Sequence, residues 1–302
     1  MHRTADPISV MPGSCGSYSK AMAPDDIANT PRREFDLQFV DKAAATLGRV
    51  QYHLRVGPDD LRPTPALPPP AMLLPGDPDR VGRIAAWLDE PREVAHHREY
   101  RTAVGARHGV PVGACSTGIG CPSTAIAVEE LANCEVSTLV RVGSTAALQP
   151  GIAVGDLVVS TGSMKNEGTS RMYVPDALPA VPDLALTSAL VSAASQVAAE
   201  RGIGVHVGLG ASDDAFYAET PEQVRRMSEL GLLNVEMEAS ALYTIAHLRG
   251  LKAGMVCAVS GNLVTDEVVY EGINERLVAG WEAAIDAALR AVVRMAQRPA
   301  TS

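Results

Sequence analysis

The sequence predicts an α/β fold with a largely buried central sheet flanked by helices. Short, nearly continuous apolar segments recur along the chain, and segments with helical periodicity lie between several of them. No internal repeat or change of composition divides the chain. Strands buried on both faces have continuous apolar sequences, and their alternation with amphipathic helices is typical of α/β proteins. We therefore expect one domain over residues 46–298.

The expected elements follow in order from residue 71. The predicted strands are apolar runs at 71–76, 110–118, 137–144, 156–162, 205–212 and 254–261. The predicted helices are the periodic segments 78–89, 122–133, 183–201, 220–231, 239–250 and 274–297. Residues 1–45 are rich in Pro, Ser, Ala and charge, which predicts a disordered extension. "PTPALPPP" (63–70) predicts a stiff, extended lead-in, and residues 299–302 form a short tail.

Composition excludes several classes of protein. The chain has 302 residues, a net charge of −9 and only 4% aromatic residues, which argues against non-specific nucleic-acid binding and base-stacking surfaces. No run of about 18 apolar residues predicts a membrane span, and no signal peptide is evident. Five scattered cysteines without a CxxC pair indicate neither a zinc site nor a disulfide framework, so we expect a cytoplasmic protein. They are Cys15, Cys115, Cys121, Cys134 and Cys257.

Polar loops follow five of the apolar runs. They are "GDPDR" (76–80), "STGIGCPST" (116–124), "RVGSTAALQP" (141–150), "GASDDAFY" (210–217) and "SGNLVTDE" (260–267). Ligands of α/β proteins bind beyond the carboxyl ends of strands. We therefore expect a ligand site where these loops converge.

Two of these loops predict anion binding. In "GDPDR", Gly76 and the exposed backbone N–H groups can receive an anion, and Arg80 adds positive charge. A capped helix start with a surface arginine is the alternative. In "RVGST", Arg141, a glycine amide and a hydroxyl together form an oxyanion cradle. A structural ion pair of Arg141 with a carboxylate such as Asp156 is the alternative there.

A third motif, "NVEMEAS" (234–240), places Glu236 and Glu238 between apolar flanks. Burying a charge is costly unless a partner pairs with it. If the segment is extended, both carboxylates lie on one face. This geometry fits a ligand-binding pair and a structural ion pair equally well. "HHREY" (96–100), taken alone, is typical of a solvated charge cluster, and His53 in "YHL" is weaker still.

Other catalytic motifs are absent from the sequence. There is no P-loop or GxGxxG, and the glycines of "GIGCPSTAIAVEEL" fit neither spacing. We find no HExxH and no arrangement typical of a Ser-His-Asp triad. The sequence therefore predicts a site for an anionic ligand with a carboxylate pair and without a metal.

In their order along the chain, these motifs resemble the nucleoside phosphorylase I family, closest to its uridine phosphorylase branch. The resemblance runs from about Tyr52 to Met295 and includes "LPGDPDRV", "HREY", "CSTGIGCPSTAIAVEEL", "RVGSTAALQP", "VHVGLGASDDAFY", "NVEMEAS" and "LKAGMVCAVSGN". It implies a single catalytic domain with a central mixed, twisted sheet. It also implies phosphorolysis of a nucleoside to a free base and (deoxy)ribose 1-phosphate. Phosphate is then a co-substrate and no cofactor is required.

The resemblance assigns roles to particular residues. It implies a phosphate site of Gly76, Arg80, Arg141, Ser144 and, from a neighbouring subunit, Arg98. It implies a ribose site of Met237, Glu238, Glu236 and, again from a neighbouring subunit, His53. Among these, Arg141, Arg80 and Glu238 would be catalytic. Glu99 and Ser123 match positions that hold a monovalent cation in some members. Sites shared in this way require at least a homodimer, and the family also forms hexamers built as trimers of dimers.

The base pocket departs from the family pattern. The expected pocket residues are Thr145, Ala146, Phe216, Gly261 and Leu263. The Gln-Arg pair that reads uracil in uridine phosphorylases has no counterpart in the short segment after "FY". Leu263 replaces a pyrimidine-branch arginine, and Gly261 replaces the aspartate of the purine branch. Polar candidates for contacting the base are Asn262, Asp213, Asp214, Thr265 and Asp266.

Three readings stay open at this point. Uridine-type phosphorolysis follows from the overall similarity, whereas the short segment after "FY" favours a purine or broad-specificity phosphorylase. A non-catalytic paralogue that binds nucleoside or phosphate is the third reading, because the base readers are missing. The three arginines Arg80, Arg98 and Arg141 argue against a hydrolytic nucleosidase of the same fold.

Overall fold

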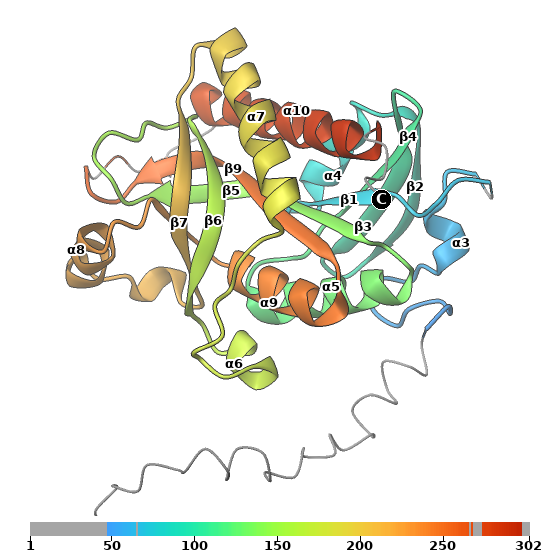
Figure 1. The fold of residues 1–302 in the computed structure, drawn as a ribbon, viewed down its shortest axis with the longest axis horizontal. Helices are drawn as coiled ribbons and strands as arrows, with labels where there is room; N and C mark the ends of the chain where they lie inside the picture. Colours follow the sequence, from blue (N-terminus) through green and yellow to red (C-terminus); the bar gives the residue numbers. More distant parts are fainter. Residues whose placement is uncertain (1–46, 65, 266, 268–273, 298–302) are drawn as a thin grey trace, which may run out of the picture. The chain divides into compact units, whose positions relative to one another are not determined.

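A mixed sheet lies at the centre of the computed structural model, which describes residues 47–64, 66–265, 267 and 274–297 (Figure 1). Its strands are β1 (Ala71–Leu74), β2 (Asp89–His97), β3 (Tyr100–Arg107), β4 (Val110–Cys115), β5 (Thr138–Ala147), β6 (Leu157–Asn166), β7 (Val205–Asp213), β8 (Asn234–Glu236) and β9 (Lys252–Asn262). The helices are α3 (Pro58–Leu61), α4 (Asp79–Ala85), α5 (Cys121–Asn133), α6 (Thr169–Tyr173), α7 (Leu184–Arg201), α8 (Pro221–Glu229), α9 (Ala239–Arg249) and α10 (Glu275–Gln297), and one 3₁₀ turn, η1, spans Phe216–Ala218.

The sheet closes on itself over part of its width. Its strand order is β2-β3-β4-β1-β5-β8-β7-β6-β9, and β9 pairs with β5 as well as with β6. Parallel pairs such as β5–β9 occur beside antiparallel pairs such as β5–β8 and β6–β9. The predicted mixed sheet flanked by helices is therefore confirmed. The closure brings β5, β8 and β9 together, and these strands carry or lead into the motifs "RVGST", "NVEMEAS" and "SGNLVTDE".

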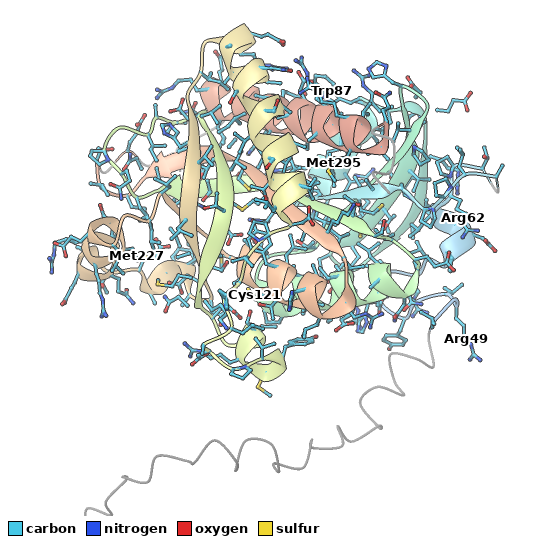
Figure 2. The ribbon with its side chains drawn as sticks, in the orientation of Figure 1. Arg49, Arg62, Trp87, Cys121, Met227 and Met295 are labelled. Atoms are coloured by element: carbon cyan, nitrogen blue, oxygen red, sulfur yellow. The ribbon has the colours of Figure 1, made fainter. Side chains whose placement is uncertain are left out.

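Two layers of helices bury the two faces of the sheet (Figure 1). On one side α7 and α10 pack over an aliphatic core that includes Leu157, Leu190 and Val256. On the other side α5 and α9 pack over a second core that includes Leu131 and Tyr243. Figure 2 labels Trp87 and Met295, two larger side chains that pack against the first core. The two cores hold the strands rigidly, and so they position the loops beyond the strand ends.

The six predicted strands and six predicted helices are all present, but the region around "HHREY" differs. The expected helix 78–89 ends at Ala85, and β2 begins at Asp89. "HHREY" forms the turn between β2 and β3, with Arg98 in the left-handed region at φ 56°. β2 is mostly exposed and polar, so it lacks the apolar alternation by which a strand is recognised. The charge cluster is thus part of a hairpin.

Several predictions concern residues outside the described ranges. The disordered extension 1–45, the tail 299–302 and the base-pocket candidate Asp266 all lie there, and the limits 46–298 stay a prediction. The described residues all fall within one compact unit. Among them, no helix combines the length and apolar character needed to cross a membrane.

Candidate active site

Most of the predicted site residues line one cavity of about 460 Å³. Those that line it are Gly76, Arg80, Arg141, Ser144, Thr145, Ala146, Phe216, Glu236, Met237, Glu238, Gly261 and Leu263. Gly143, the glycine of the predicted "RVGST" cradle, also lines it. Sequence reasoning did not single out the remaining lining residues, which are Asp77, Ile119, Glu219, Val235, Ser260 and Glu267. The convergence of polar loops at one edge of the sheet is therefore observed.

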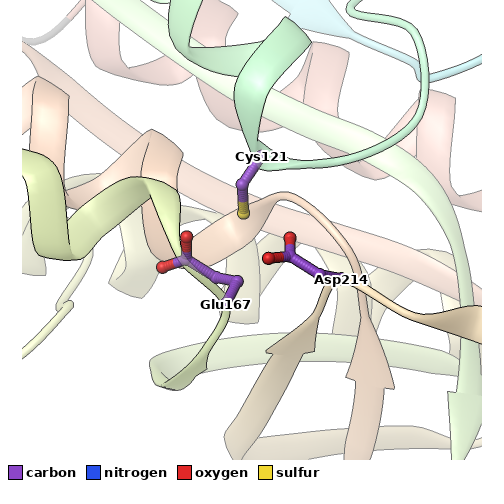
Figure 3. A group of neighbouring side chains, drawn as sticks. All are labelled: Cys121, Glu167 and Asp214. Carbon is purple, nitrogen blue, oxygen red and sulfur yellow. The ribbon is translucent and has the colours of Figure 1, made fainter. Parts of the chain in front are cut away.

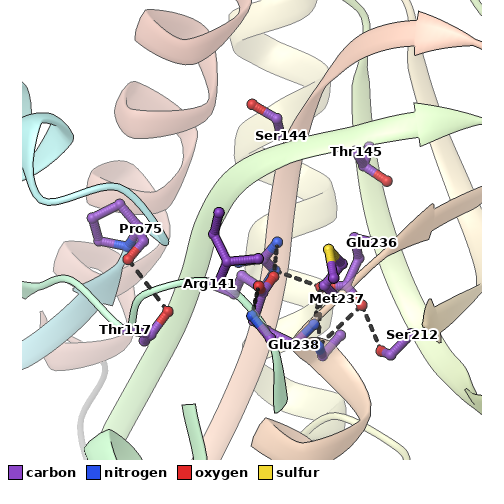
Figure 4. Close-up of polar contacts among 12 residues, drawn as sticks. Pro75, Thr117, Arg141, Ser144, Thr145, Ser212, Glu236, Met237 and Glu238 are labelled. Carbon is purple, nitrogen blue, oxygen red and sulfur yellow. Dashed lines mark hydrogen bonds and ion pairs between the residues drawn. The ribbon is translucent and has the colours of Figure 1, made fainter. Parts of the chain in front are cut away.

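A buried ion-pair cluster forms the centre of the cavity wall (Figure 4). The Nε atom of Arg141 lies 2.6 Å from Oε2 of Glu236, and its Nη2 atom pairs with Glu238. All three side chains are almost fully buried. The guanidinium passes close to Gly143, where an added Cβ would lie 3.3 Å from Nη1. Asp156, the alternative partner of Arg141, instead pairs with His206 at 2.8 Å.

Glu236 braces this cluster through its other contacts. Its carboxylate accepts hydrogen bonds from the backbone N–H groups of Glu238 (2.9 Å) and Ala239 (3.0 Å), and from the Ser212 hydroxyl (2.5 Å). With Arg141 added, its oxygens are committed within the protein. The geometry thus favours bracing over sugar contact, and the predicted contact of Glu236 with ribose stays a prediction.

Glu238 follows β8 at the point where the chain turns into α9. Its backbone angles are φ −138° and ψ −25°, so the extended geometry considered for "NVEMEAS" ends before this residue. The two carboxylates meet because both reach Arg141. Oε1 of Glu238 also accepts the Gly120 N–H at 2.6 Å. Burial raises the pKa of Glu238, Arg141 opposes this rise, and the like charge of Glu236 adds to it.

Arg80 and Ser144 line the part of the cavity where the sequence predicts anion binding, which we call the anion end. Burial lowers the pKa of Arg80, and the positive charge of Arg141 contributes further, although Asp77 at 3.9 Å acts in the opposite direction. The guanidinium carbon of Arg80 lies 4.1 Å from the ring centroid of Trp281. The same indole donates to the Ser144 hydroxyl at 2.8 Å. Sequence reasoning missed Trp281, because the last helix carries no motif and lies far from both partners in the chain.

We call the part of the cavity lined by Phe216 and Leu263, where the sequence predicts the base pocket, the base end. Most of the polar candidates from the sequence form hydrogen bonds within the protein. The Thr145 hydroxyl donates to the carbonyl of Val235 (2.8 Å). Asn262 holds its own loop through the carbonyls of Gln149 (2.9 Å) and Ile152 (2.8 Å). The carboxylates of Asp213 and Asp214 accept hydrogen bonds from Asn166 (2.7 Å) and from the N–H of Gly168 (2.9 Å). Thr265, the remaining candidate among the described residues, donates its backbone N–H to Oδ1 of Asn262 at 3.3 Å.

Carboxylates are the ionisable side chains that line the base end among the described residues. Glu267 pairs with Arg276 at 2.7 Å. Burial raises the pKa of Glu219, and nearby Asp213 raises it further. Phe216 is 43% exposed and faces the cavity from η1, whereas Leu263 packs against a small apolar core. Glu219 follows the "FY" motif, so its position was the signal that could have identified it.

Comparison with known proteins agrees with this architecture. Residues 70–295 match the family described as "Phosphorylase superfamily", which covers most of the chain. The chain belongs to this superfamily. Uridine phosphorylase from Thermococcus kodakarensis is 44% identical over 247 residues, or 78% of this chain and 85% of the relative. Guanosine phosphorylase from Halorubrum lacusprofundi is 47% identical over 192 residues, or 64% of this chain and 78% of the relative.

Solved structures of the superfamily share the fold. Uridine phosphorylase from Vibrio fischeri superposes with a TM-score of 0.70 and 33% identity, covering 81% of this chain and 97% of the other. Purine nucleoside phosphorylase from Toxoplasma gondii, in complex with immucillin-H, gives 0.72 and 27%, covering 82% of this chain and 96% of the other. The predicted family resemblance is confirmed.

His53 and Arg98, which are predicted to act in the site of a neighbouring subunit, do not line the cavity. His53 pairs through Nδ1 with Glu130 at 2.6 Å, and its carbonyl accepts from His97 at 2.9 Å. Arg98 is exposed at the hairpin turn, and no ion pair or hydrogen bond of its side chain occurs within the described ranges. The Arg98 side chain is therefore exposed and the His53 side chain partly exposed, and their use across an interface stays a prediction.

Glu99 and Ser123, the predicted cation position, lie side by side around Gly118. A Cβ at Gly118 would lie 2.7 Å from Cγ of Glu99 and 3.0 Å from the Ser123 hydroxyl. Gly118 also has a φ of +70°, which favours glycine. The fold therefore brings these two positions together, and a cation there remains a prediction.

A second group of possible metal ligands lies next to residues Met237 and Ser240. Cys121, Glu167 and Asp214 each offer a ligand atom, and these atoms all lie within 4.8 Å of one another (Figure 3). The Cys121 thiol donates to the carbonyl of Met237 at 3.2 Å, and Glu167 accepts from the Ser240 hydroxyl at 3.0 Å. Burial raises the pKa of Cys121, and Glu167 raises it further. The group thus has a structural use, which is to hold the backbone on either side of Glu238.

Proposed function

We propose that this protein cleaves the N-glycosidic bond of a nucleoside by phosphorolysis, with a uridine-type nucleoside as substrate. An oxygen of inorganic phosphate bonds to C1′ of the sugar as the C1′–N bond breaks. The bonding electrons of the broken bond leave with the base, which departs as an anion or is protonated. The products are a free base and (deoxy)ribose 1-phosphate.

The observation that carries the proposal is the placement of Arg80, Arg141 and Glu238 around one cavity. The two arginines and the Ser144 hydroxyl supply donors for a phosphate dianion, and they hold it beside the sugar. Glu238 accepts from the 2′- and 3′-hydroxyls, and its charge favours the cationic character that develops at C1′. Each charge-assisted hydrogen bond contributes about 1.5–3 kcal/mol.

In this proposal Glu236 fixes the positions of the Arg141 and Glu238 side chains relative to each other. Arg141 is shared between the two carboxylates, so phosphate and sugar meet at one rigid unit. Met237 lies between the two glutamates and lines the cavity, where its side chain covers the ribose. No covalent enzyme intermediate is needed, and phosphate is the co-substrate.

The proposed assembly is a homo-oligomer with sites shared across a dimer interface, of the kind that also builds trimers of dimers. His53 would then reach the ribose 5′-hydroxyl, and Arg98 the phosphate, of a neighbouring subunit. The exposed position of Arg98 and the partly exposed position of His53, both outside the cavity, support this. We propose a cytoplasmic enzyme of nucleoside salvage and catabolism.

A guanosine phosphorylase is the second candidate, and a specific observation favours it. Glu219 at the base end accepts N–H donors, which a 2-amino-6-oxopurine presents side by side on one edge. Among the described residues, no lysine or arginine lines that end to offer donors to the carbonyls of uracil. The 47% identity to a guanosine phosphorylase points the same way.

The test is phosphate dependence across a panel of nucleosides. Uridine, thymidine, inosine, guanosine and adenosine are incubated with the protein, with and without phosphate, and the free base is measured. We expect phosphate-dependent release of uracil from uridine. Phosphate-independent release would identify a hydrolase instead, guanine as the main product would support the second candidate, and no release from any nucleoside would leave a binding protein.

A further inference from the structure

Trp281 stands out among the residues that the proposed reaction does not use. It lies on α10, about 200 residues after Arg80 and about 140 residues after Ser144, yet it contacts both. Its indole Nε1 lies 2.8 Å from the Ser144 Oγ, and its ring centroid lies 4.1 Å from the guanidinium carbon of Arg80. Both partners line the anion end of the cavity, and Trp281 itself is set behind them.

We propose that Trp281 is a positioning residue of the phosphate site, where its N–H orients the Ser144 hydroxyl and its ring face holds the Arg80 guanidinium. This inference rests on the proposed function for the identity of the anion. It assigns no contact between the indole and the substrate, because Trp281 acts through its two partners.

The hydrogen bond sets the direction of the Ser144 hydroxyl. An indole N–H is a donor only, so the Ser144 oxygen is the acceptor in this bond. The hydroxyl hydrogen then remains for another acceptor. The oxygens of a phosphate dianion are such acceptors, and Ser144 lines the cavity in which the phosphate would bind. Trp281 therefore prepares Ser144 as a donor before phosphate arrives.

The ring face solves a second problem at Arg80. This guanidinium is largely buried near Arg141, and like charges repel. A closely paired carboxylate would relieve the repulsion, but it would also compete with phosphate for the same cation. The nearest one, Asp77, lies 3.9 Å away. An aromatic face attracts a cation without neutralising it, so Arg80 keeps its full charge for the anion.

The proposal connects the C-terminal helix to phosphate binding. α10 packs against α7 and β9 through buried residues such as Ala284 and Ala288, so Trp281 is held by the core. Arg83, one turn after Arg80, also faces the ring at 5.8 Å and approaches Glu282 at 3.7 Å. The alignment of α4 with α10 thus sets the distance between the indole and Arg80.

The chain offers a matched control for Trp281→Phe. Trp87 likewise donates through Nε1 to an oxygen, that of Glu282 at 2.8 Å, and likewise has an arginine, Arg107, 5.8 Å from its ring. Neither partner of Trp87 lines the cavity. Trp87→Phe therefore removes an indole N–H hydrogen bond to the same helix, α10, at residues that do not line the cavity.

The experiment compares Trp281→Phe, Trp281→Leu and Trp87→Phe by their KM for phosphate and for nucleoside. Trp281→Phe keeps a ring for Arg80 and loses the donor, so we expect KM for phosphate to rise about 10-fold. Trp281→Leu loses both interactions, and the rise should be about 50-fold. In both variants KM for nucleoside should stay within about 2-fold of the parent value. Equal KM values for phosphate in Trp281→Phe and Trp87→Phe would overturn the proposal.

Two further readouts separate positioning from general damage. Trp281→Phe introduced into a Ser144→Ala background should raise KM for phosphate little further, because the hydroxyl that the indole orients is already gone. A further rise as large as in the parent background would refute the orientation.

The chain has two tryptophans, so Trp87→Phe leaves Trp281 as the only one. Inorganic phosphate should then change its fluorescence without any nucleoside. This readout holds even if the parent protein shows no phosphorolysis, so failure of the proposed function and failure of this inference are distinguishable.

Discussion

Arg141 and its two carboxylate partners form a buried cluster on one wall of the cavity, whereas at the base end Phe216, Glu219 and Leu263 lie beyond the strands, in a single turn and in loops. Arg141 lies within β5 and is clamped by two buried carboxylates. Phe216 lies in η1 and is 43% exposed. Under the proposed function, this difference means that the phosphate and ribose contacts belong to the buried core of the fold, while residues that contact the base can change without disturbing it.

Removing Arg141 should have the largest effect, because it is the centre of the buried cluster. Arg141→Ala leaves Glu236 and Glu238 buried without their cation, and we expect a loss of about 3–5 kcal/mol in the free energy of unfolding. Phosphorolysis should fall about 10³-fold. Denaturant unfolding and initial rates measure the two effects. Arg225→Ala, which breaks an exposed pair with Glu229, is the control. Near-normal kinetics in Arg141→Ala would refute the assigned role.

Glu238→Gln tests the ribose contact within the same buried cluster. The change removes the charge and keeps the shape, so we expect kcat/KM for uridine to fall about 10²-fold. The loss should be smaller for 2′-deoxyuridine, which lacks one of the two hydroxyls. Comparing kcat/KM for uridine and 2′-deoxyuridine in the parent and in the variant isolates the contact of Glu238 with the 2′-hydroxyl. An equal loss with both substrates would mean that Glu238 does not bind the 2′-hydroxyl.

The pH dependence of the same residue gives a third test. The folded-state pKa of Glu238 is raised, so the folded protein binds this proton more tightly than the unfolded chain does. Its ionisation therefore destabilises the fold progressively as the pH rises from the unfolded value through the folded one. Activity needs the ionised form and should fall as the pH drops through the raised pKa. The Tm of Glu238→Gln relative to the parent should rise with pH, and the acidic limb of its rate profile should disappear.

The difference between the two ends also explains what the sequence could predict. Strands and helices with continuous apolar or periodic patterns were recognised, and they carry Arg80, Arg141 and Glu238 to one edge. β2, β3 and β8 were missed. β2 is polar and exposed, β3 carries arginines near both of its ends, and β8 spans three residues. Trp281 was missed because its role depends on how α10 packs. Asn262 looked like a base reader, yet its side chain holds its own loop, and only coordinates show which way such a polar group points.

Phe216→Ala tests the base end. Phe216 lines the cavity but is partly exposed, so its loss should leave the free energy of unfolding nearly unchanged and raise KM for nucleoside about 10-fold. KM for phosphate should not change. Tyr217 is adjacent, aromatic and 98% exposed, and Tyr217→Ala is the matched control. A change in KM for phosphate with Phe216→Ala would show that the two ends are not independent.

Glu219→Gln should give the smallest effect and the sharpest test of the base end. If Glu219 accepts from a purine edge, the amide weakens that contact and supplies donors suited to carbonyls, so the ratio of kcat/KM for guanosine to that for uridine should fall about 5-fold. The ratio is informative because phosphate is the co-substrate of both reactions, so a change at the anion end alters both kcat/KM values equally and cancels in the ratio. Glu222→Gln removes an exposed carboxylate three residues away and should leave the ratio unchanged. If the ratio is the same in all three proteins, Glu219 does not contact the base, and the choice between uridine and guanosine is made by the shape of the cavity around Ala146 and Leu263.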